Sequence, residues 1–330
     1  MQLSADKTEV CYVNKQFMLE YSQTLNINIK QGNNAVFLDC NINTPSVISL
    51  PVIGIDSILT GSNNDSLIDS LRSNQNSYLL SPGKQLIRVE FIAEQAGAIK
   101  LRLNDFAYFH SVSMLHNTVM SLYIGLCISL AIFVGLLGRG IKRSGFNFYA
   151  IYLISIAIFF GIQEGVFNYF SFELPFLHTR SAQLIFAGIV VFTATLFISR
   201  LLDFKLLIND ITSQFLTYVS ASIMTLGIFT LFIPVSITNL LSAIMGWSTL
   251  VLVFTIFCIA GFAAINKVHT ASLVVIALST VLFGMIFRIW LTDLSDFLNR
   301  YALIIATAIE SLIFAFAASE KVRYLGKANA

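Results

Sequence analysis

Charged side chains are scarce in this sequence. Asp, Glu, Lys and Arg make up 12% of its 330 residues, whereas hydrophobic residues make up 56%. A soluble domain usually carries about 25% charged residues, which help to cover its surface with polar groups. Because the mean hydropathy is +0.77, much of the surface is expected to face a lipid bilayer. The net charge of +2 is too small to indicate a nucleic-acid-binding protein.

Cysteine and histidine are rare, with four of each. They form no cluster with the spacing of metal ligands, so no metal site is predicted. Cys127 and Cys258 lie in apolar stretches, where cysteine usually packs as a small hydrophobic residue. Cys11 and Cys40 lie in the more polar first part, and they could form a disulfide if that part is outside the cytoplasm.

Motifs of catalysis are missing as well. The sequence contains no phosphate-binding glycine-rich loop, no HExxH and no GxSxG. The polar segments between the long apolar runs are too short to hold a catalytic domain. We therefore expect neither an enzyme nor a cofactor. Residues 1–15 also lack an apolar signal sequence, so a cleaved signal or the first membrane helix would have to export the first part.

The first part of the chain, residues 1–112, has the alternating pattern of β-strands. Apolar and polar residues alternate in four stretches, at residues 25–30, 35–42, 85–93 and 98–103. Such a period of two buries one face of a strand. Polar segments rich in Gly, Asn, Pro and Ser separate these stretches and favour turns. The pattern predicts a small all-β sandwich domain.

The second part, residues 113–325, consists mainly of long apolar runs. A helix needs about 20 apolar residues to cross the hydrocarbon layer. The run of residues 211–266 has no charge and is long enough for two helices, which Pro234 separates. The predicted membrane helices are residues 118–138, 146–170, 180–200, 212–233, 237–265, 270–291 and 297–319. The predicted fold class is thus an α-helical membrane protein, a seven-transmembrane-helix bundle preceded by an extracytoplasmic β-sandwich, with residues 326–330 as a short tail.

Basic residues follow alternate helices. One side of the membrane would carry Arg139, Lys142, Arg143, Arg200, Lys205, Lys267, Lys321, Arg323 and Lys327. The other side would carry Glu173, Asp293 and Asp296, with Arg180 and Arg300 at helix ends as candidate outer-face charges. Since Lys and Arg collect on the cytoplasmic side, the β domain is expected in the periplasm and the C-terminus in the cytoplasm.

Ionisable groups inside a membrane are costly, and each is therefore a candidate functional residue. On the second predicted helix, Gly161, Glu164 and Asn168 would share one face. Arg288 on the sixth helix would lie at the same depth as Glu164, so the two could form an ion pair near the outer interface. A structural bridge and a ligand-binding or switch role both remain open for this pair.

Glu310 lies deeper, about 20 Å from the outer surface if counted at 1.5 Å per residue. Thr307, Glu310, Ser311 and Phe314 form one stripe on the last helix. Because no basic residue is predicted at that depth, burial disfavours the charged carboxylate. Glu310 would then be a neutral group that bonds to a neighbouring helix, or a switch that changes its proton or its partner.

Three apolar segments resemble one known family of bacterial membrane receptors. They are residues 121–133 (SLYIGLCISLAIF), 146–170 (FNFYAIYLISIAIFFGIQEGVFNYF) and 298–325 (LNRYALIIATAIESLIFAFAASEKVRYL). They resemble the membrane domain of the 7TMR-DISM family, the seven-transmembrane receptors with diverse intracellular signalling modules, and Glu310 stands at that family's acidic position. Residues 81–103 (SPGKQLIRVEFIAEQAGAIKLRL) resemble the end of the family's periplasmic β-sandwich.

The resemblance implies a bacterial inner-membrane receptor that senses a periplasmic ligand or protein. In that family a kinase, cyclase or phosphatase usually follows the last helix, and its absence here implies an unidentified separate partner. Several alternatives stay open: a non-catalytic scaffold or accessory subunit of a secretion, transport or polymer-assembly complex, and a homodimer as the assembled form. A transporter is disfavoured because the sequence shows no inverted repeat.

Overall fold

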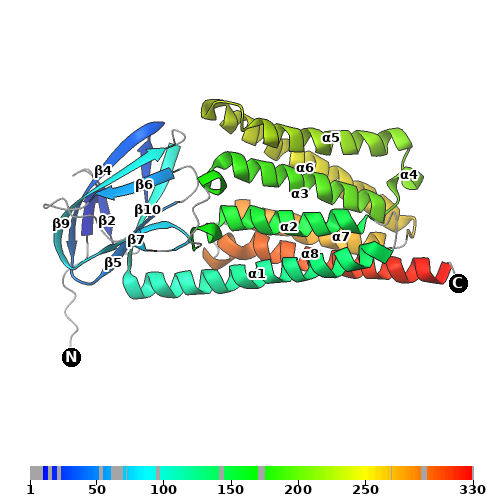
Figure 1. Cartoon of the computed structure of the whole chain (residues 1–330), viewed down its shortest axis with the longest axis horizontal. Coiled ribbons are helices and arrows are strands. Elements are labelled where there is room, and N and C mark those ends of the chain that lie inside the picture. The colour runs from blue at the N-terminus through cyan, green and yellow to red at the C-terminus, as the bar shows by residue number, and fades with distance from the viewer. Residues whose placement is uncertain are drawn as a thin grey trace. The chain divides into compact units, whose positions relative to one another are not determined.

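The computed structural model describes residues 10–13, 17–20, 24–51, 55–60, 70–71, 73–93, 97–140, 145–169, 175–268, 270–290 and 296–328. The chain forms two compact units. The first contains residues 1–120 and 161–182, and the second contains residues 121–160 and 183–330. The β-strands belong to the first unit and most of the helical residues to the second (Figure 1).

The strands form two five-stranded antiparallel sheets (Figure 1). The first sheet has the order β2-β1-β4-β9-β6 and the second the order β3-β10-β5-β8-β7. The strands are β1 (Val10–Val13), β2 (Phe17–Glu20), β3 (Thr24–Ile29), β4 (Gly32–Ile42), β5 (Ser46–Leu50), β6 (Ile55–Thr60), β7 (Ser70–Leu71), β8 (Asn76–Leu80), β9 (Gly83–Ala93) and β10 (Gly97–Asp105). All four stretches with the alternating pattern lie within or almost wholly within strands, and the predicted β-sandwich is confirmed.

Alternation of side chains explains how the two sheets share one core. Along β4, Val36, Leu38, Cys40 and Ile42 are buried, whereas the residues between them are exposed. On the neighbouring strand β9 of the same sheet, the buried side chains are Ile87, Val89 and Phe91. They form one hydrophobic cluster with buried residues of the second sheet, namely Ile48, Leu50, Tyr78, Leu80, Ile99, Leu101 and Leu103. The core therefore lies between the sheets, as burial of apolar area requires.

Cys11 and Cys40 form a disulfide inside this core. The two residues face each other on the paired strands β1 and β4, and their Cα atoms are 4.1 Å apart. Both side chains are fully buried. The disulfide fixes the short strand β1 to the long strand β4.

The membrane part consists of helices that follow the sandwich directly. The long helices are α1 (Phe106–Gly140), α2 (Phe146–Gln163), α3 (Arg180–Leu201), α5 (Asp210–Phe229), α6 (Val235–Ile265), α7 (Ala271–Trp290) and α8 (Asp296–Ala328). Between them lie the short 3-10 helices η1 (Val166–Tyr169) and η2 (Pro175–His178) and the four-residue α4 (Phe204–Leu207).

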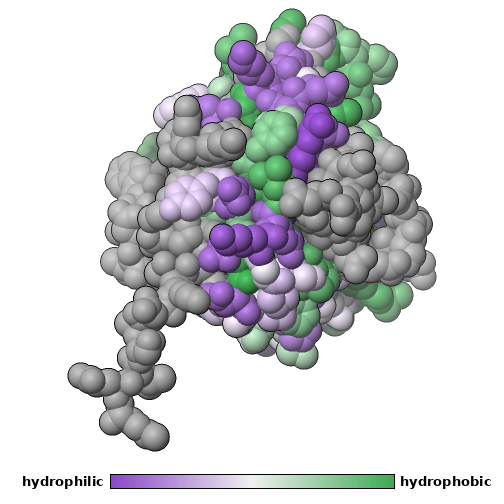
Figure 2. Space-filling model, turned by 90° about the vertical axis from the view of Figure 1, so that its left-hand side faces the viewer, coloured by the Kyte–Doolittle hydropathy of each residue, from purple (hydrophilic) through white to green (hydrophobic). Residues whose placement is uncertain are grey.

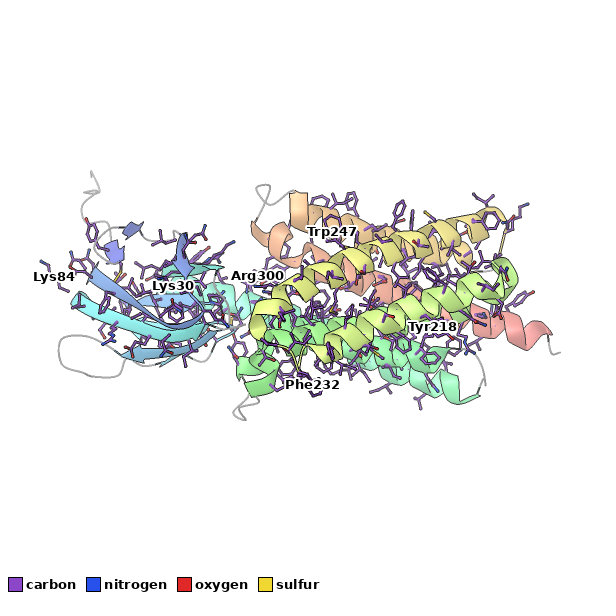
Figure 3. All side chains as sticks on the ribbon, turned by 90° about the horizontal axis from the view of Figure 1, so that it is seen from above. Lys30, Lys84, Tyr218, Phe232, Trp247 and Arg300 are labelled. Carbon is purple, nitrogen blue, oxygen red and sulfur yellow. A yellow bond between two sulfur atoms is a disulfide. The ribbon has the colours of Figure 1, made fainter. Side chains whose placement is uncertain are left out.

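Side chains that point outwards from the helices are mostly apolar. Tyr218, Phe232 and Trp247 are among the most exposed, and Figure 3 labels all three. Six described helices are long and apolar enough to cross a membrane, and residues Ala271–Phe287 of α7 form a shorter apolar helix. Because exposed apolar surface of this extent suits a lipid environment, these six or seven helices of the described residues fit the membrane bundle that the sequence predicted.

Two helix ends differ from the prediction. The first helix begins at Phe106 and not near 118, because Asp105 caps it: its Oδ2 accepts hydrogen bonds from the amides of Ala107 and Tyr108, at 3.0 and 3.3 Å. No linker separates β10 from α1. The boundary predicted at 112 therefore falls inside α1, and the first compact unit continues to Met120.

The second helix ends at Gln163 and not near 170. Gly165 adopts a φ of +70°, which a helix interior does not allow. A Cβ atom at this position would lie 2.2 Å from the carbonyl oxygen of Asn74 in the sandwich. The chain therefore leaves the helix and packs against the loop between β7 and β8, within the first compact unit.

Candidate functional site

Glu310 is buried inside the helix bundle, with only 5% of its surface exposed. The buried hydroxyl of Tyr152, on α2, donates a hydrogen bond of 2.7 Å to the Oε2 atom of Glu310 on α8. No Lys, Arg or His among the described residues forms an ion pair with Glu310. Because burial of a carboxyl without a hydrogen bond is costly, the Tyr152 hydroxyl is the group that stabilises Glu310 at this place.

One turn before Glu310, Thr307 meets the first helix. The hydroxyl oxygens of Thr307 and Tyr123 are 3.3 Å apart, and Thr307 also donates to the carbonyl of Ile304 at 3.0 Å. Tyr123 lies on α1 and is buried, with its ring edge-on to Phe160 of α2 at 5.5 Å. Thr307 and Tyr123 thus link α8 to α1.

One turn after Thr307, the main chain of α8 meets α2. The hydroxyl of Tyr149 donates a hydrogen bond to the carbonyl oxygen of Ser311. The Tyr149 ring stacks on Phe197 of α3 with 4.5 Å between the centroids and lies edge-on to Phe314 of α8. The rings of Phe197 and Phe314 also pack against each other, with 5.4 Å between their centroids. Aromatic packing therefore continues from the hydroxyl groups towards the C-terminal half of α8.

We call Tyr123, Tyr149, Tyr152, Thr307 and Glu310 the hydroxyl cluster. Its members come from α1, α2 and α8, and all five side chains are buried. A buried polar network of this kind couples the positions of the helices that carry it, since each broken bond leaves an unsatisfied group.

Ser311 adds a polar group that is not used. Its hydroxyl is buried and has no hydrogen-bond partner among the described residues. A hydroxyl can rotate and can both donate and accept. The cluster consequently contains a spare donor and acceptor on the residue next to Glu310, which a second arrangement of the network could use.

The sequence identified Glu310 and Thr307 but missed the tyrosines. Tyr149 and Tyr152 lie in the predicted second membrane helix, and the sequence analysis did not single them out. They are three residues apart, so they lie on the same face of α2, and both occur in a helix without any charge. Tyrosine hydroxyls that share a helix face at membrane depth are the signal that could have revealed them, because buried tyrosine usually bonds a partner.

Glu164 and Asn168 do not lie on a helical face with Gly161. Because α2 ends at Gln163, Glu164 is in the turn that follows and Asn168 is in η1. The carbonyl of Glu164 lies 3.2 Å from Nε2 of His116, a fully buried residue of α1 that the sequence analysis had not identified. Both residues belong to the first compact unit, so this predicted intramembrane site is part of a connection beside the sandwich.

For the predicted partner of Glu164 and for the predicted outer-face charges, the structure gives the position in the chain and few contacts. Arg288 lies in α7 in the other unit, and its side chain is outside the described set. The ion pair between Glu164 and Arg288 remains a prediction. Arg180 is the first residue of α3, Arg300 lies over the ring of Tyr301, and Asp296 is the first residue of α8. Asp293 falls outside the described residues.

The outward face of the first sheet is a second candidate site. Four large apolar side chains, Tyr12, Phe37, Leu86 and Ile92, are exposed there. Arg88 lies over the Phe37 ring at 5.7 Å and pairs with Glu90. Figure 2 shows the mixture of hydrophobic and hydrophilic side chains on the sandwich. An exposed face of this kind is suited to contact another molecule.

No group of three His, Cys, Asp or Glu residues in the described ranges could hold a metal ion. In the described residues, a β-sandwich is followed by long apolar helices with buried polar groups between them, which is the architecture of an integral membrane protein. The family model described as 7TM diverse intracellular signalling matches residues 116–321. The chain therefore belongs to the 7TMR-DISM family, and the resemblance seen in the sequence is confirmed. No curated protein matches the chain.

Proposed function

We propose that the protein is a bacterial inner-membrane receptor. Its β-sandwich detects a periplasmic ligand or protein, and its last helix passes the signal to a cytoplasmic partner. Membership of the family indicates that the membrane domain is a receptor-like signalling domain. The finer proposal rests on the hydroxyl cluster, because this cluster connects α8 to α1, the helix that directly follows the last strand.

The input element is α1. It follows β10 without a linker and is capped by Asp105, so a shift of that strand moves the start of the helix. Tyr123 lies 17 residues further on, about 26 Å along the helix axis. A continuous helix transmits rotation and translation over this distance, and Tyr123 contacts Thr307 of α8.

The switching element is the hydroxyl cluster. In the arrangement described, Tyr152 bonds Glu310 and Tyr149 bonds the carbonyl of Ser311. A rotation of α8 would bring the spare hydroxyl of Ser311 into use and break the bond to Tyr152. Two arrangements of similar free energy are what a ligand needs in order to shift a population.

The orientation in the membrane is part of the proposal. The excess of Lys and Arg on alternate loops supports a cytoplasmic C-terminus. The disulfide between Cys11 and Cys40 supports a periplasmic sandwich, because disulfides persist in oxidising compartments and are rare in the cytoplasm.

Cysteine labelling tests this orientation. In a Cys258→Ser background, Lys84→Cys on the sandwich is expected to react with a membrane-impermeant maleimide in intact spheroplasts. Tyr324→Cys on α8 is expected to react only after permeabilisation, because both positions are exposed and the proposed orientation puts them on opposite sides of the membrane. The parent without either added cysteine is the control. Equal labelling of both in intact spheroplasts contradicts the orientation.

Co-purification tests the function. The full chain, with an affinity tag after residue 330, is purified from its own membranes in mild detergent beside the Glu310→Leu variant at equal expression. We expect a kinase, cyclase, phosphatase or response regulator with the wild type and at least a fivefold smaller amount with the variant. Recovery of a secretion, transport or polymer-assembly machine in equal amounts from both would favour the accessory-subunit alternative and contradict the receptor.

A further inference from the structure

Lys321, near the C-terminal end of α8, is held by the end of another helix. Its Nζ atom donates to the carbonyl oxygens of Arg200 and Leu201, at 2.8 and 2.6 Å. It also pairs with the Oδ2 atom of Asp203 at 3.0 Å. The three donors of the ammonium group therefore have three acceptors, two in the last residues of α3 and one in the turn that follows.

This arrangement differs from a lysine on a solvated helix face. The last carbonyls of a helix have no partner within the helix, and a basic side chain that binds them also interacts favourably with the helix dipole. Only 13% of the Lys321 side chain is exposed. Asp203 has a left-handed backbone, with φ of 49°, in the turn just after α3, and its carboxylate reaches Lys321.

The Lys321 contact lies on the same face of α8 as the hydroxyl cluster. Glu310 and Lys321 are 11 residues apart, which is close to three helical turns and about 16 Å. Phe314 lies between them and contacts Phe197 of α3. Leu201 follows Phe197 by one turn, so the aromatic contact and the lysine contact connect the same two helices.

The residue just before α2 also lies against the end of α3. Gly145, just before α2, has a φ of +77°, and a Cβ atom there would lie 2.6 Å from Cβ of Arg200. The end of α3 is thus in contact with α2 and with α8. The contacts of Tyr149 and Phe314 and the bonds of Lys321 therefore all join α8 to the same two neighbouring helices.

We propose that Lys321, Asp203 and the carbonyls of Arg200 and Leu201 form a clamp that holds the end of α8 against α3. Release of this clamp frees the part of α8 beyond Lys321 for a partner. The interpretation as an output switch rests on the proposed receptor function, whereas the clamp itself is a property of the bundle.

Distances between spin labels test the clamp without a ligand or a partner. The labels are placed on Asn209→Cys, beside the α4–α5 turn, and Tyr324→Cys, on α8; both positions are exposed. The full chain with Cys258→Ser is measured in lipid nanodiscs. We expect Lys321→Met to shift the distance distribution to longer values and to broaden it. Asp203→Asn should do so less, because the two carbonyl bonds remain.

Arg323→Met is the matched control, since Arg323 pairs with Glu320 of its own helix and is largely exposed. It is expected to leave the distribution unchanged. A Lys321→Met distribution that overlaps the wild type overturns the clamp. If Lys321→Met does not fold, an unchanged Asp203→Asn distribution overturns it instead.

Glu310→Leu with the same labels separates the clamp from the receptor mechanism. A shift in Lys321→Met and in Glu310→Leu supports a clamp that is coupled to the hydroxyl cluster. A shift in Lys321→Met alone supports the clamp but contradicts its coupling to the cluster, and therefore the proposed route of the signal.

Discussion

Replacement of Glu310 by Leu is expected to lower the free energy of unfolding of the helix bundle by about 1–3 kcal/mol. The reason is that the hydroxyl of Tyr152 loses its acceptor while it stays buried, and an unsatisfied buried donor carries about that cost. Glu310→Gln is expected to have a much smaller effect, because the amide oxygen can still accept the same bond.

A double-mutant cycle with Tyr152→Phe isolates the pair. The double variant Tyr152→Phe, Glu310→Leu removes both polar groups, so it should be more stable than the sum of the two single effects predicts. Couplings between helices in membranes average about 0.6 kcal/mol and reach about 1.7 kcal/mol, and this fully buried pair is expected near the upper value.

The measurement is reversible unfolding in mixed micelles, followed by the fluorescence of Trp247 and Trp290. Tyr218→Phe on α5 is the control for loss of a hydroxyl, because Tyr218 is exposed and faces outwards (Figure 3). Additive effects of Tyr152→Phe and Glu310→Leu would show that the hydrogen bond does not couple α2 to α8, and the proposed switching element would be lost.

Removal of the disulfide by Cys11→Ser and Cys40→Ser is expected to destabilise the β-sandwich by about 3–4 kcal/mol. The two cysteines are 29 residues apart, and closing a loop of that length restricts the unfolded chain by about this amount. Two buried hydroxyls in place of sulfur add to the loss.

Hydrogen exchange of the full chain in detergent measures this effect. Amides of β4 and β9 that exchange by opening of the whole sandwich are expected to exchange about two to three powers of ten faster, since each 1.4 kcal/mol is a factor of ten. Cys258→Ser on α6 is the control and should leave these rates unchanged, because Cys258 is exposed in the membrane part. Unchanged exchange in the double Ser variant would contradict a stabilising disulfide.

The sequence alone determined the membrane helices and the sandwich, because both depend on the local order of apolar residues. A helix in lipid must be predominantly apolar, and a half-buried strand must alternate, whatever its neighbours are. The acidic position at Glu310 was also visible, since a lone carboxyl in an apolar run is costly wherever it lies.

Tertiary structure decided what these residues contact. The turn at Gly165 and its packing on Asn74 end α2 early and place Glu164 outside it, which no count along the sequence could show. Tyr152 bonds Glu310, although the two are 158 residues apart in the sequence. Lys321 bonds the end of α3, which is about 120 residues away from it in the sequence. Hydrogen bonds need atoms within about 3 Å, and which atoms come that close is set by the packing of helices that are distant in the sequence.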